Sequence, residues 1–151
     1  MDNRDAMNFL VRAKKATFAG NGAKMTPTRP NSKDLQYVEG ELKYIDTYLG
    51  GANFAGEEAL WENDIPFWSM NYIGRNLSND VSAESIMKFL TEALLLVPAE
   101  YPYRGPLQYT NGDFSYACSI QGDFHWFSGT EEIHYNGSKV YELVFHGGDV
   151  K

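Results

Sequence analysis

Two stretches of the chain repeat their apolar residues at the spacing of an amphipathic helix. The first helix is predicted over about residues 3–16, where four apolar residues recur every three or four positions: Ala6, Phe9, Leu10 and Ala13. The second is predicted over residues 82–96, with Asp80 or Ser82 as its N-cap and Pro98 as the residue that ends it.

Strand-like alternation of apolar and polar residues follows each predicted helix. After the first helix we predict strands at about residues 42–49 and 54–62, and a third through Trp68, Met70 and Tyr72. After the second we predict strands at about residues 114–120, 124–135 and 140–146. The dipeptide Asn136-Gly137 is typical of a two-residue hairpin turn, so it is expected to join the last two strands.

Three short motifs occur twice, in the same order. MNFLVRA (7–13) returns as MKFLTEA (87–93), LQYVEG (35–40) as LQYTNG (107–112), and FAGEEAL (54–60) as FSGTEEI (127–133). Such a repeat indicates two copies of one supersecondary unit that bury their apolar faces against each other.

These patterns together predict an α+β fold with internal duplication. Each unit is expected to be a helix followed by a three-stranded antiparallel meander (α-β-β-β twice), with a pseudo-twofold axis and the helices packed on antiparallel sheet. The chain is then a single domain, 1–151, made of a first repeat at 3–76 and a second at 82–148.

Composition and charge narrow the classes of function. The net charge of −7 argues against a surface that follows nucleic-acid phosphates, so no direct nucleic-acid binding is expected. Residues 1–33 nevertheless carry a net charge of +5, which fits either a basic segment lying on an acidic body or an anion site.

Cysteine, histidine and hydropathy give no sign of a metal, a cofactor or a membrane. Cys118 is the only cysteine, so neither an internal disulfide nor a zinc-type cluster can form, and its apolar neighbours at alternate positions predict burial. His125 and His134 have opposite strand parity and cannot converge on one metal ion without a bulge. No apolar run is long enough to span a bilayer and no signal core is present, so a cytoplasmic location is expected.

Glu58 and Glu131 occupy corresponding places in the repeated motif and share strand parity with apolar neighbours. A carboxylate on an apolar face costs desolvation free energy unless a partner compensates it. The two could act together as an acid–base or cation-binding pair. Alternatively, each accepts hydrogen bonds within the fold or lies at an exposed strand end.

A cluster of polar-tipped rings is predicted around the first strand. Tyr44, Asp46 and Tyr48 share one face, with Tyr37 upstream and Trp61 on the next strand. Such a set fits a pocket for a cationic or hydroxyl-rich organic ligand, or an aromatic core whose hydroxyls reach the rim.

Arg29 and Arg104 lie in corresponding loops before the strands, in TRPNSKD and YPYRGP. Either guanidinium could hold a carboxylate or phosphate of a ligand, or remain in solvent.

The sequence also resembles a known family. The stretch LQYVEGELKYIDTYLGGANFAGEEALW, followed by FWSMNYIGR, PYRGPLQY, GDFSYACSIQGDF and VYELVFHGG, is similar to an uncharacterised bacterial domain-of-unknown-function family. Members of that family occur alone or C-terminal to an Xre-type helix-turn-helix domain. The resemblance implies a regulatory or effector-binding role and a possible helix-turn-helix partner protein, and it supplies no catalytic residues.

The favoured interpretation is a small-molecule-binding or sensor-like regulatory domain, because a cleft between two α+β halves lined by tyrosine, tryptophan and carboxylate suits a small organic ligand. One alternative is a small cytoplasmic enzyme that uses the Glu58/Glu131 pair. Another is a protein-interaction accessory module, and a homodimer is also possible.

Overall fold

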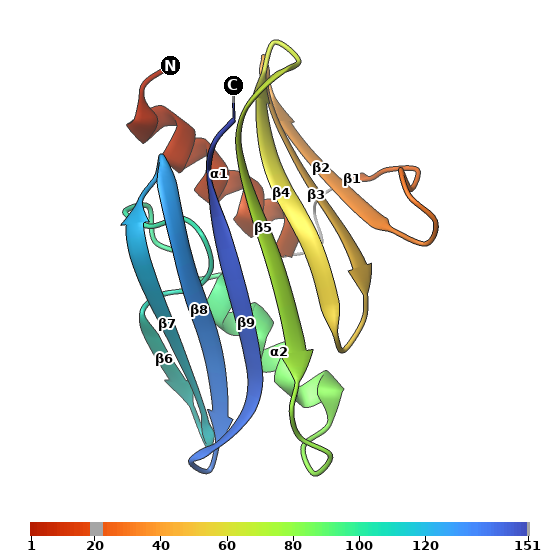
Figure 1. Ribbon diagram of the computed structural model, residues 1–151, viewed down its shortest axis with the longest axis vertical. Helices are drawn as coiled ribbons and strands as arrows, with labels where there is room; N and C mark the ends of the chain where they lie inside the picture. The colour runs from red at the N-terminus through yellow and green to blue at the C-terminus, as the bar shows by residue number, and fades with distance from the viewer. Residues whose placement is uncertain (19–22, 151) are drawn as a thin grey trace.

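A computed structural model describes residues 1–18 and 23–150 of the chain. Within them, nine strands form one antiparallel sheet in the order β1-β2-β3-β4-β5-β9-β8-β7-β6, and two helices lie on one side of it (Figure 1). The elements are α1 (Asn3–Phe18), β1 (Ala23–Lys24), β2 (Lys33–Glu39), β3 (Leu42–Gly50), β4 (Phe54–Glu62), β5 (Ile65–Asn76), α2 (Ala83–Leu94), β6 (Gln108–Asn111), β7 (Phe114–Asp123), β8 (Trp126–Tyr135) and β9 (Ser138–Asp149).

The predicted fold of two α-β-β-β units is wrong, because all the strands join in a single nine-stranded antiparallel sheet. Four strands follow α2, and four longer strands follow the short β1 after α1. The missed strands are the two-residue β1 and the strands β2 and β6, which contain most of the two LQY segments. Gly40 and Gly112 follow these segments with φ of +57° and +59°, so the chain turns back and each segment pairs with the next strand.

The junction between the two halves is also a strand pair rather than a packed interface. β5 and β9 run side by side in antiparallel register from Trp68 opposite Asp149 to Asn76 opposite Tyr141. They lie at the centre of the sheet in Figure 1. The apolar faces of the two halves therefore merge into one continuous inner face.

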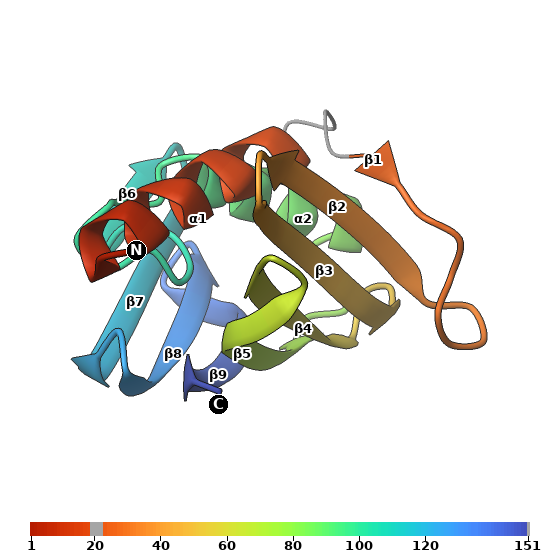
Figure 2. The same ribbon diagram turned by 90° about the horizontal axis from the view of Figure 1, so that it is seen from above.

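The sheet is strongly curved and forms a trough that holds both helices. Viewed from above, β7 and β8 rise on one side and β3 and β4 on the other, with α1 and α2 lying between them (Figure 2). The apolar residues of the repeated helix motif and of the paired strands β5 and β9 lie buried in this trough: Phe9, Leu10, Ala13, Trp68, Met70, Phe89, Leu90, Ala93, Leu143 and Phe145.

The structure confirms the two predicted helices and the hairpin turn at Asn136-Gly137. Helix α1 extends two residues beyond its predicted end, whereas α2 stops at Leu94. Asn136 and Gly137 have φ of +49° and +83°, as a tight hairpin turn requires. Among the described residues, no helix is long and apolar enough to cross a membrane.

Ser82 is the N-cap of α2, one of the two residues expected there. Its hydroxyl oxygen accepts a hydrogen bond from the backbone N–H of Ser85 at 3.1 Å. Ser82→Ala should lower the free energy of unfolding by about 1 kcal/mol, because it leaves a helix N–H without its side-chain acceptor. Urea denaturation measures the change, and Ser138→Ala, at the exposed start of β9, is the control. Equal effects of both substitutions would contradict this assignment.

Candidate functional site

The inner face of the sheet carries an ion pair that is shielded from solvent. The alternation of β4 turns Glu58 toward the helices, between Gly56 and Leu60. Lys14 of α1 donates hydrogen bonds to both carboxylate oxygens, at 2.7 and 2.9 Å, and each side chain is at most 1% exposed. Removing two charges from water is costly, and close pairing compensates that cost. The pair thus fixes α1 over the centre of the sheet.

Asp46 and Tyr44, both on β3, extend this cluster. The Tyr44 hydroxyl donates to Glu58 Oε1, and Asp46 lies opposite Glu58 in the β3–β4 register. On the next strand but one, the Tyr72 hydroxyl donates to Asp46 Oδ1 at 2.6 Å. The cluster therefore places two carboxyl groups side by side in the interior.

A second buried ion pair lies on the β6–β9 side of the trough. Arg104 donates from Nε to Glu131 Oε2 at 3.1 Å and from Nη2 to Oε1 at 2.9 Å. Glu131 also accepts the hydroxyl groups of Tyr116 at 2.6 Å and Tyr141 at 2.8 Å. The guanidinium carbon lies 5.4 Å from the ring centroid of Tyr72, so the two clusters adjoin. Glu131 is thus held by four charge-assisted or hydroxyl hydrogen bonds.

The charges of the two clusters do not balance if every group is ionised. Lys14 and Arg104 supply two positive charges, whereas Asp46, Glu58 and Glu131 are three carboxyl groups. Burial, and then the charge of Glu58, raise the pKa of Asp46 to about 7. Asp46 is accordingly the group that retains a proton in the folded protein below that pH. Burial also lowers the pKa of Lys14, although the nearby Glu58 opposes the shift.

The same two cations hold the loop between α2 and β6. Lys14 Nζ donates to the backbone carbonyl of Tyr103 at 2.6 Å, and Arg104 is bound to Glu131. The backbone N–H of Gly105 donates to the Tyr116 hydroxyl at 2.9 Å. Three successive residues of the loop are therefore anchored to the inner face.

This anchored loop forms one wall of a pocket of about 810 Å³ at one end of the trough. The other walls are the first turns of α1, strand β7 and the β7–β8 hairpin. The lining residues are Asn3, Met7, Glu100, Tyr101, Tyr103, Leu107, Cys118, Ser119, Ile120, Gly122, Asp123, Phe124 and His125. The volume and the mixture of apolar, aromatic and polar side chains are typical of small-molecule sites.

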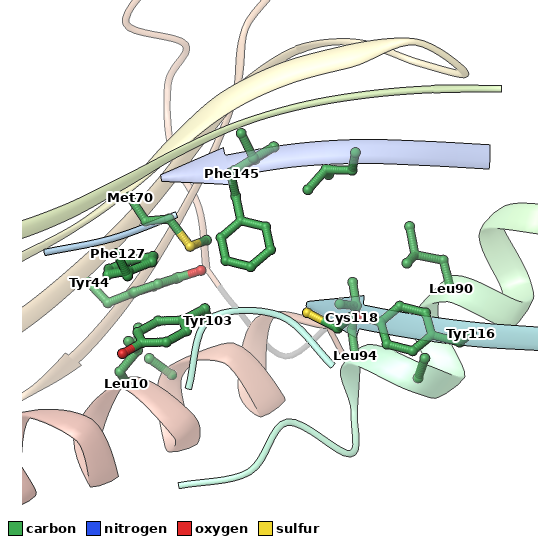
Figure 3. Close-up of a cluster of buried hydrophobic side chains, with 14 of the residues drawn as sticks. Leu10, Tyr44, Met70, Leu90, Leu94, Tyr103, Tyr116, Cys118, Phe127 and Phe145 are labelled. Atoms are coloured by element: carbon green, nitrogen blue, oxygen red, sulfur yellow. The ribbon is translucent and has the colours of Figure 1, made fainter. Parts of the chain in front are cut away.

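Stacked aromatic rings support the inner wall of the pocket. Tyr103 stacks on Phe127 with ring centroids 3.9 Å apart, and Trp68 stacks between Phe127 and Phe124 at 5.7 and 5.1 Å. Figure 3 shows Tyr103 and Phe127 within the buried cluster, above helix α1. The indole N–H of Trp68 donates to the carbonyl of Phe124 at 2.9 Å. Packing thus fixes the orientation of Tyr103 and Phe124 at the pocket.

His125 is held at the mouth of the pocket by two polar partners. Its Nδ1 lies 2.8 Å from Asp149 Oδ2, and its Nε2 lies 2.7 Å from the amide nitrogen of Asn3. A neutral ring that donates from Nδ1 to Asp149 and accepts at Nε2 satisfies both contacts. This arrangement links the start of α1 to the end of β9 across the pocket rim.

Cys118 lines the pocket but is a buried thiol, as the sequence predicts. Burial, and then the charge of Glu131, raise its pKa to about 12. The thiol therefore stays protonated at neutral pH and contributes packing rather than nucleophilic reactivity.

The structure brings together five of the nine residues singled out from the sequence as ligand contacts: Tyr44, Asp46, Glu58, Arg104 and Glu131. All five lie in the two ion-pair clusters, and Glu58 and Glu131 are each bound to a separate cation. None of the five lines the 810 Å³ pocket. Direct ligand contact by these residues stays a prediction.

The other four candidates lie elsewhere. Tyr37 is half-buried, its ring lies tilted against Phe9, and its hydroxyl donates to Glu39 at 2.6 Å. Tyr48 is half-buried toward the end of β3, and Trp61 lies beyond a shift in the β4–β5 register. Arg29 is exposed in the loop before β2 and borders a separate hollow on the outer face of the sheet.

The sequence analysis missed the cation that pairs with Glu58. Lys14 follows Leu10 by four residues and precedes Thr17 by three, so it lies on the buried stripe of α1. The sequence did contain a signal for this ion pair. A lysine on the apolar stripe of a helix and a glutamate on the apolar face of a strand both need a buried partner of opposite charge. The sequence analysis also missed the Tyr72 and Tyr141 hydroxyls as partners of Asp46 and Glu131, because strand alternation does not show which side chains meet across the sheet.

Comparison with known families now adds to this geometry. Residues 46–150 match DUF5680, a domain of unknown function. The chain belongs to the DUF5680 family. The matched region contains both acidic residues of the ion pairs and Arg104, whereas Lys14 lies before it. No curated protein and no solved structure matches the chain.

Proposed function

We propose that this DUF5680 domain binds a small cationic organic molecule in the 810 Å³ pocket and acts as a sensor-like regulatory domain. The observation that supports the proposal is a pocket with aromatic and carboxylate lining whose wall is held in place by buried ion pairs. A preformed wall reduces the conformational entropy lost on binding.

The lining chemistry favours a positively charged ligand with an apolar part. Tyr101, Tyr103 and Phe124 offer ring surface, while Glu100 and Asp123 are carboxylates at the same pocket. The lining residues include neither lysine nor arginine. An ammonium group gains from both carboxylates and ring faces, whereas an anionic ligand would meet repulsion.

The buried ion pairs act in this proposal as positioning groups. Glu58 and Glu131 are each occupied by their own cation and tyrosine hydroxyls, which favours support of the loop over joint acid–base chemistry. The association with an Xre-type helix-turn-helix protein rests on the family resemblance and stays a prediction. A neighbouring reading frame encoding such a protein would support it.

Two small probes that each carry a phenyl ring, one with a positive and one with a negative charge, test whether the pocket prefers a cation. 2-Phenylethylamine at about 1 mM should raise the thermal midpoint of the wild-type protein, because a ligand that binds only the folded state stabilises it by mass action. Phenylacetate should raise it less. Tyr101→Ala should weaken amine binding about tenfold, and Glu100→Gln several-fold, through loss of ring contact and charge attraction.

Glu84→Gln is the matched control for Glu100→Gln, because Glu84 is an exposed glutamate of α2 that does not line the pocket. It should leave amine binding unchanged. Equal or stronger binding of phenylacetate would contradict the cationic class. If neither probe nor any compound of a broader metabolite panel shifts the midpoint, the proposed function is wrong.

A further inference from the structure

The outer face of the sheet, opposite the helices, carries an exposed aromatic side chain beside a second hollow. Trp126 is 81% exposed, although its neighbour Phe127 is buried on the inner face. It borders a hollow of about 300 Å³ whose lining includes Ser69, Asn71, Ser128, His146 and Gly148. This hollow is separate from the pocket of the proposed function, with which it shares no lining residue.

Strand register arranges the polar groups around the indole. Trp126 lies opposite Gly148, which in turn lies opposite Ser69, so these three form one row across β8, β9 and β5. The next outward-facing row contains Ser128, His146 and Asn71, in the same strand order. The indole therefore shares its row with Ser69 and stands beside the polar row of Ser128, His146 and Asn71.

Gly148 keeps the floor beside the indole open. Its φ is +155°, and a Cβ atom there would lie 2.2 Å from the carbonyl oxygen of His125. Any larger residue would require the backbone to move. The absence of a side chain at this position leaves a flat surface next to Trp126.

We propose that this hollow is a binding site for a neutral saccharide, with one sugar ring packed against Trp126. The C–H face of a pyranose is apolar and fits an aromatic ring, while its hydroxyl groups need partners that both donate and accept. Asn71, Ser128 and His146 provide such groups on the outer face.

The charge of the surroundings favours a sugar over a nucleotide. The lining residues of this hollow include Asp149 but neither lysine nor arginine, and the adjoining hollow adds Arg29 together with Glu57, so the two hollows have no excess of positive charge. The chain has a net charge of −7. Phosphate groups would be repelled by this surface, whereas a neutral polyol is not.

A neighbouring hollow gives room for more than one sugar unit. A cavity of about 460 Å³ shares Asn71 and His146 with the first, and continues over β4 to Glu57 and Arg29. Glu57 lies directly opposite Asn71 in the β4–β5 register. The polar row therefore extends across four strands, which suits a short linear oligosaccharide.

The indole N–H signals of the tryptophans in a ¹H–¹⁵N spectrum provide the test. Maltotetraose and tetra-N-acetylchitotetraose, two neutral oligosaccharides of different stereochemistry, are titrated to about 10 mM, which detects millimolar dissociation constants. At least one should shift the Trp126 signal and leave that of Trp68 unchanged, because Trp68 is buried and bound to Phe124. Trp126→Ala should reduce the affinity at least about tenfold, as followed by the backbone amide of Ser128.

Ile65→Ala is the control, since Ile65 is 68% exposed but lies outside both hollows. It should leave the affinity unchanged. The proposal is wrong if neither oligosaccharide shifts the Trp126 signal, or if Trp126→Ala binds as well as wild type. Stronger binding of a short oligothymidylate at Trp126 would assign the site to nucleic acid, and concentration-dependent dimerisation that Trp126→Ala abolishes would assign it to a second copy of the chain. Either result would overturn the saccharide site.

Discussion

Glu131→Ala is expected to lower the free energy of unfolding by about 3–5 kcal/mol, because it leaves the buried Arg104 guanidinium without its counter-charge. It also removes the acceptor of the Tyr116 and Tyr141 hydroxyls. Urea denaturation at neutral pH measures the change from the midpoint and slope of the transition.

The chain offers a matched exposed pair as the control. Glu142 on β9 is bound to Arg75 at 2.5 Å, and the side chains of Arg75 and Glu142 are 64% and 28% exposed. Glu142→Ala should change the free energy of unfolding far less than Glu131→Ala does, since water replaces the contacts that Arg75 and Lys139 lose. If both substitutions had the same effect, the buried pair would not carry the stabilising contribution assigned to it.

Loss of Glu131 should also affect the pocket. Arg104 is part of the loop that forms a pocket wall, and Glu131 holds both Arg104 and the Tyr116 hydroxyl that anchors Gly105. The interior charges and the proposed ligand site are therefore linked through one loop rather than through shared contacts.

Most helices and strands were predictable from the sequence, because each is indicated by the spacing of apolar residues within its own segment. Helical spacing around Phe9 and Phe89 gave both helices, and alternation gave six of the strands. Strands β1, β2 and β6 were missed. β1 and β6 have only two and four residues, and the LQY segments of β2 and β6 were interpreted only as a repeated motif. The turn glycines Gly40 and Gly112, which let those segments pair, were the overlooked signal.

The merging of the two halves could not be predicted in the same way. The pairing of β5 with β9 joins residues such as Trp68 and Asp149 that are far apart in sequence, and no turn sets their register. Apolar and polar residues alternate in the same way along both strands, and this pattern is compatible with two separately packed units as well as with one continuous sheet. Only the global packing decides between these arrangements.

The buried charged residues were predictable from the sequence, whereas the pocket was not. Strand parity placed Asp46, Glu58 and Glu131 on the inner face, and the structure brings each to a buried partner. The pocket itself is assembled from a helix start, a long loop and a hairpin, which no periodic pattern connects. Its lining residues therefore had no common signal in the sequence.

Asp46→Asn is expected to remove a pH dependence of stability that the wild-type protein shows between about pH 5 and pH 7. Asp46 has a pKa of about 7 when folded, because of burial and the neighbouring charge of Glu58, whereas the unfolded chain has an ordinary aspartate near 3.8. Between these values the folded state binds one proton more than the unfolded state, so rising pH destabilises the fold. The stabilisation is complete below the unfolded pKa and is lost as pH rises through the folded pKa.

The size of the effect follows from the two pKa values. A full proton difference gives a slope of about 1.4 kcal/mol per pH unit, so wild type should lose about 2–3 kcal/mol relative to Asp46→Asn from about pH 5 to pH 7. Above about pH 7 the difference should level off. The groups that face Asp46 are Lys14 from α1, Glu58 from β4, Tyr72 from β5 and Arg104 from the loop, and all remain in the variant.

Urea denaturation of both proteins at closely spaced pH values measures this difference, with Asp80→Asn as the control. Asp80 lies on an exposed segment before α2, so its substitution should leave the wild-type pH dependence intact. Asparagine can still accept the Tyr72 hydroxyl through its carbonyl oxygen, and the fold should therefore survive. Parallel stability curves for wild type and Asp46→Asn would mean that Asp46 is already ionised at pH 5. The interior would then contain three carboxylates against two cations, and the protonation assigned to Asp46 would be wrong.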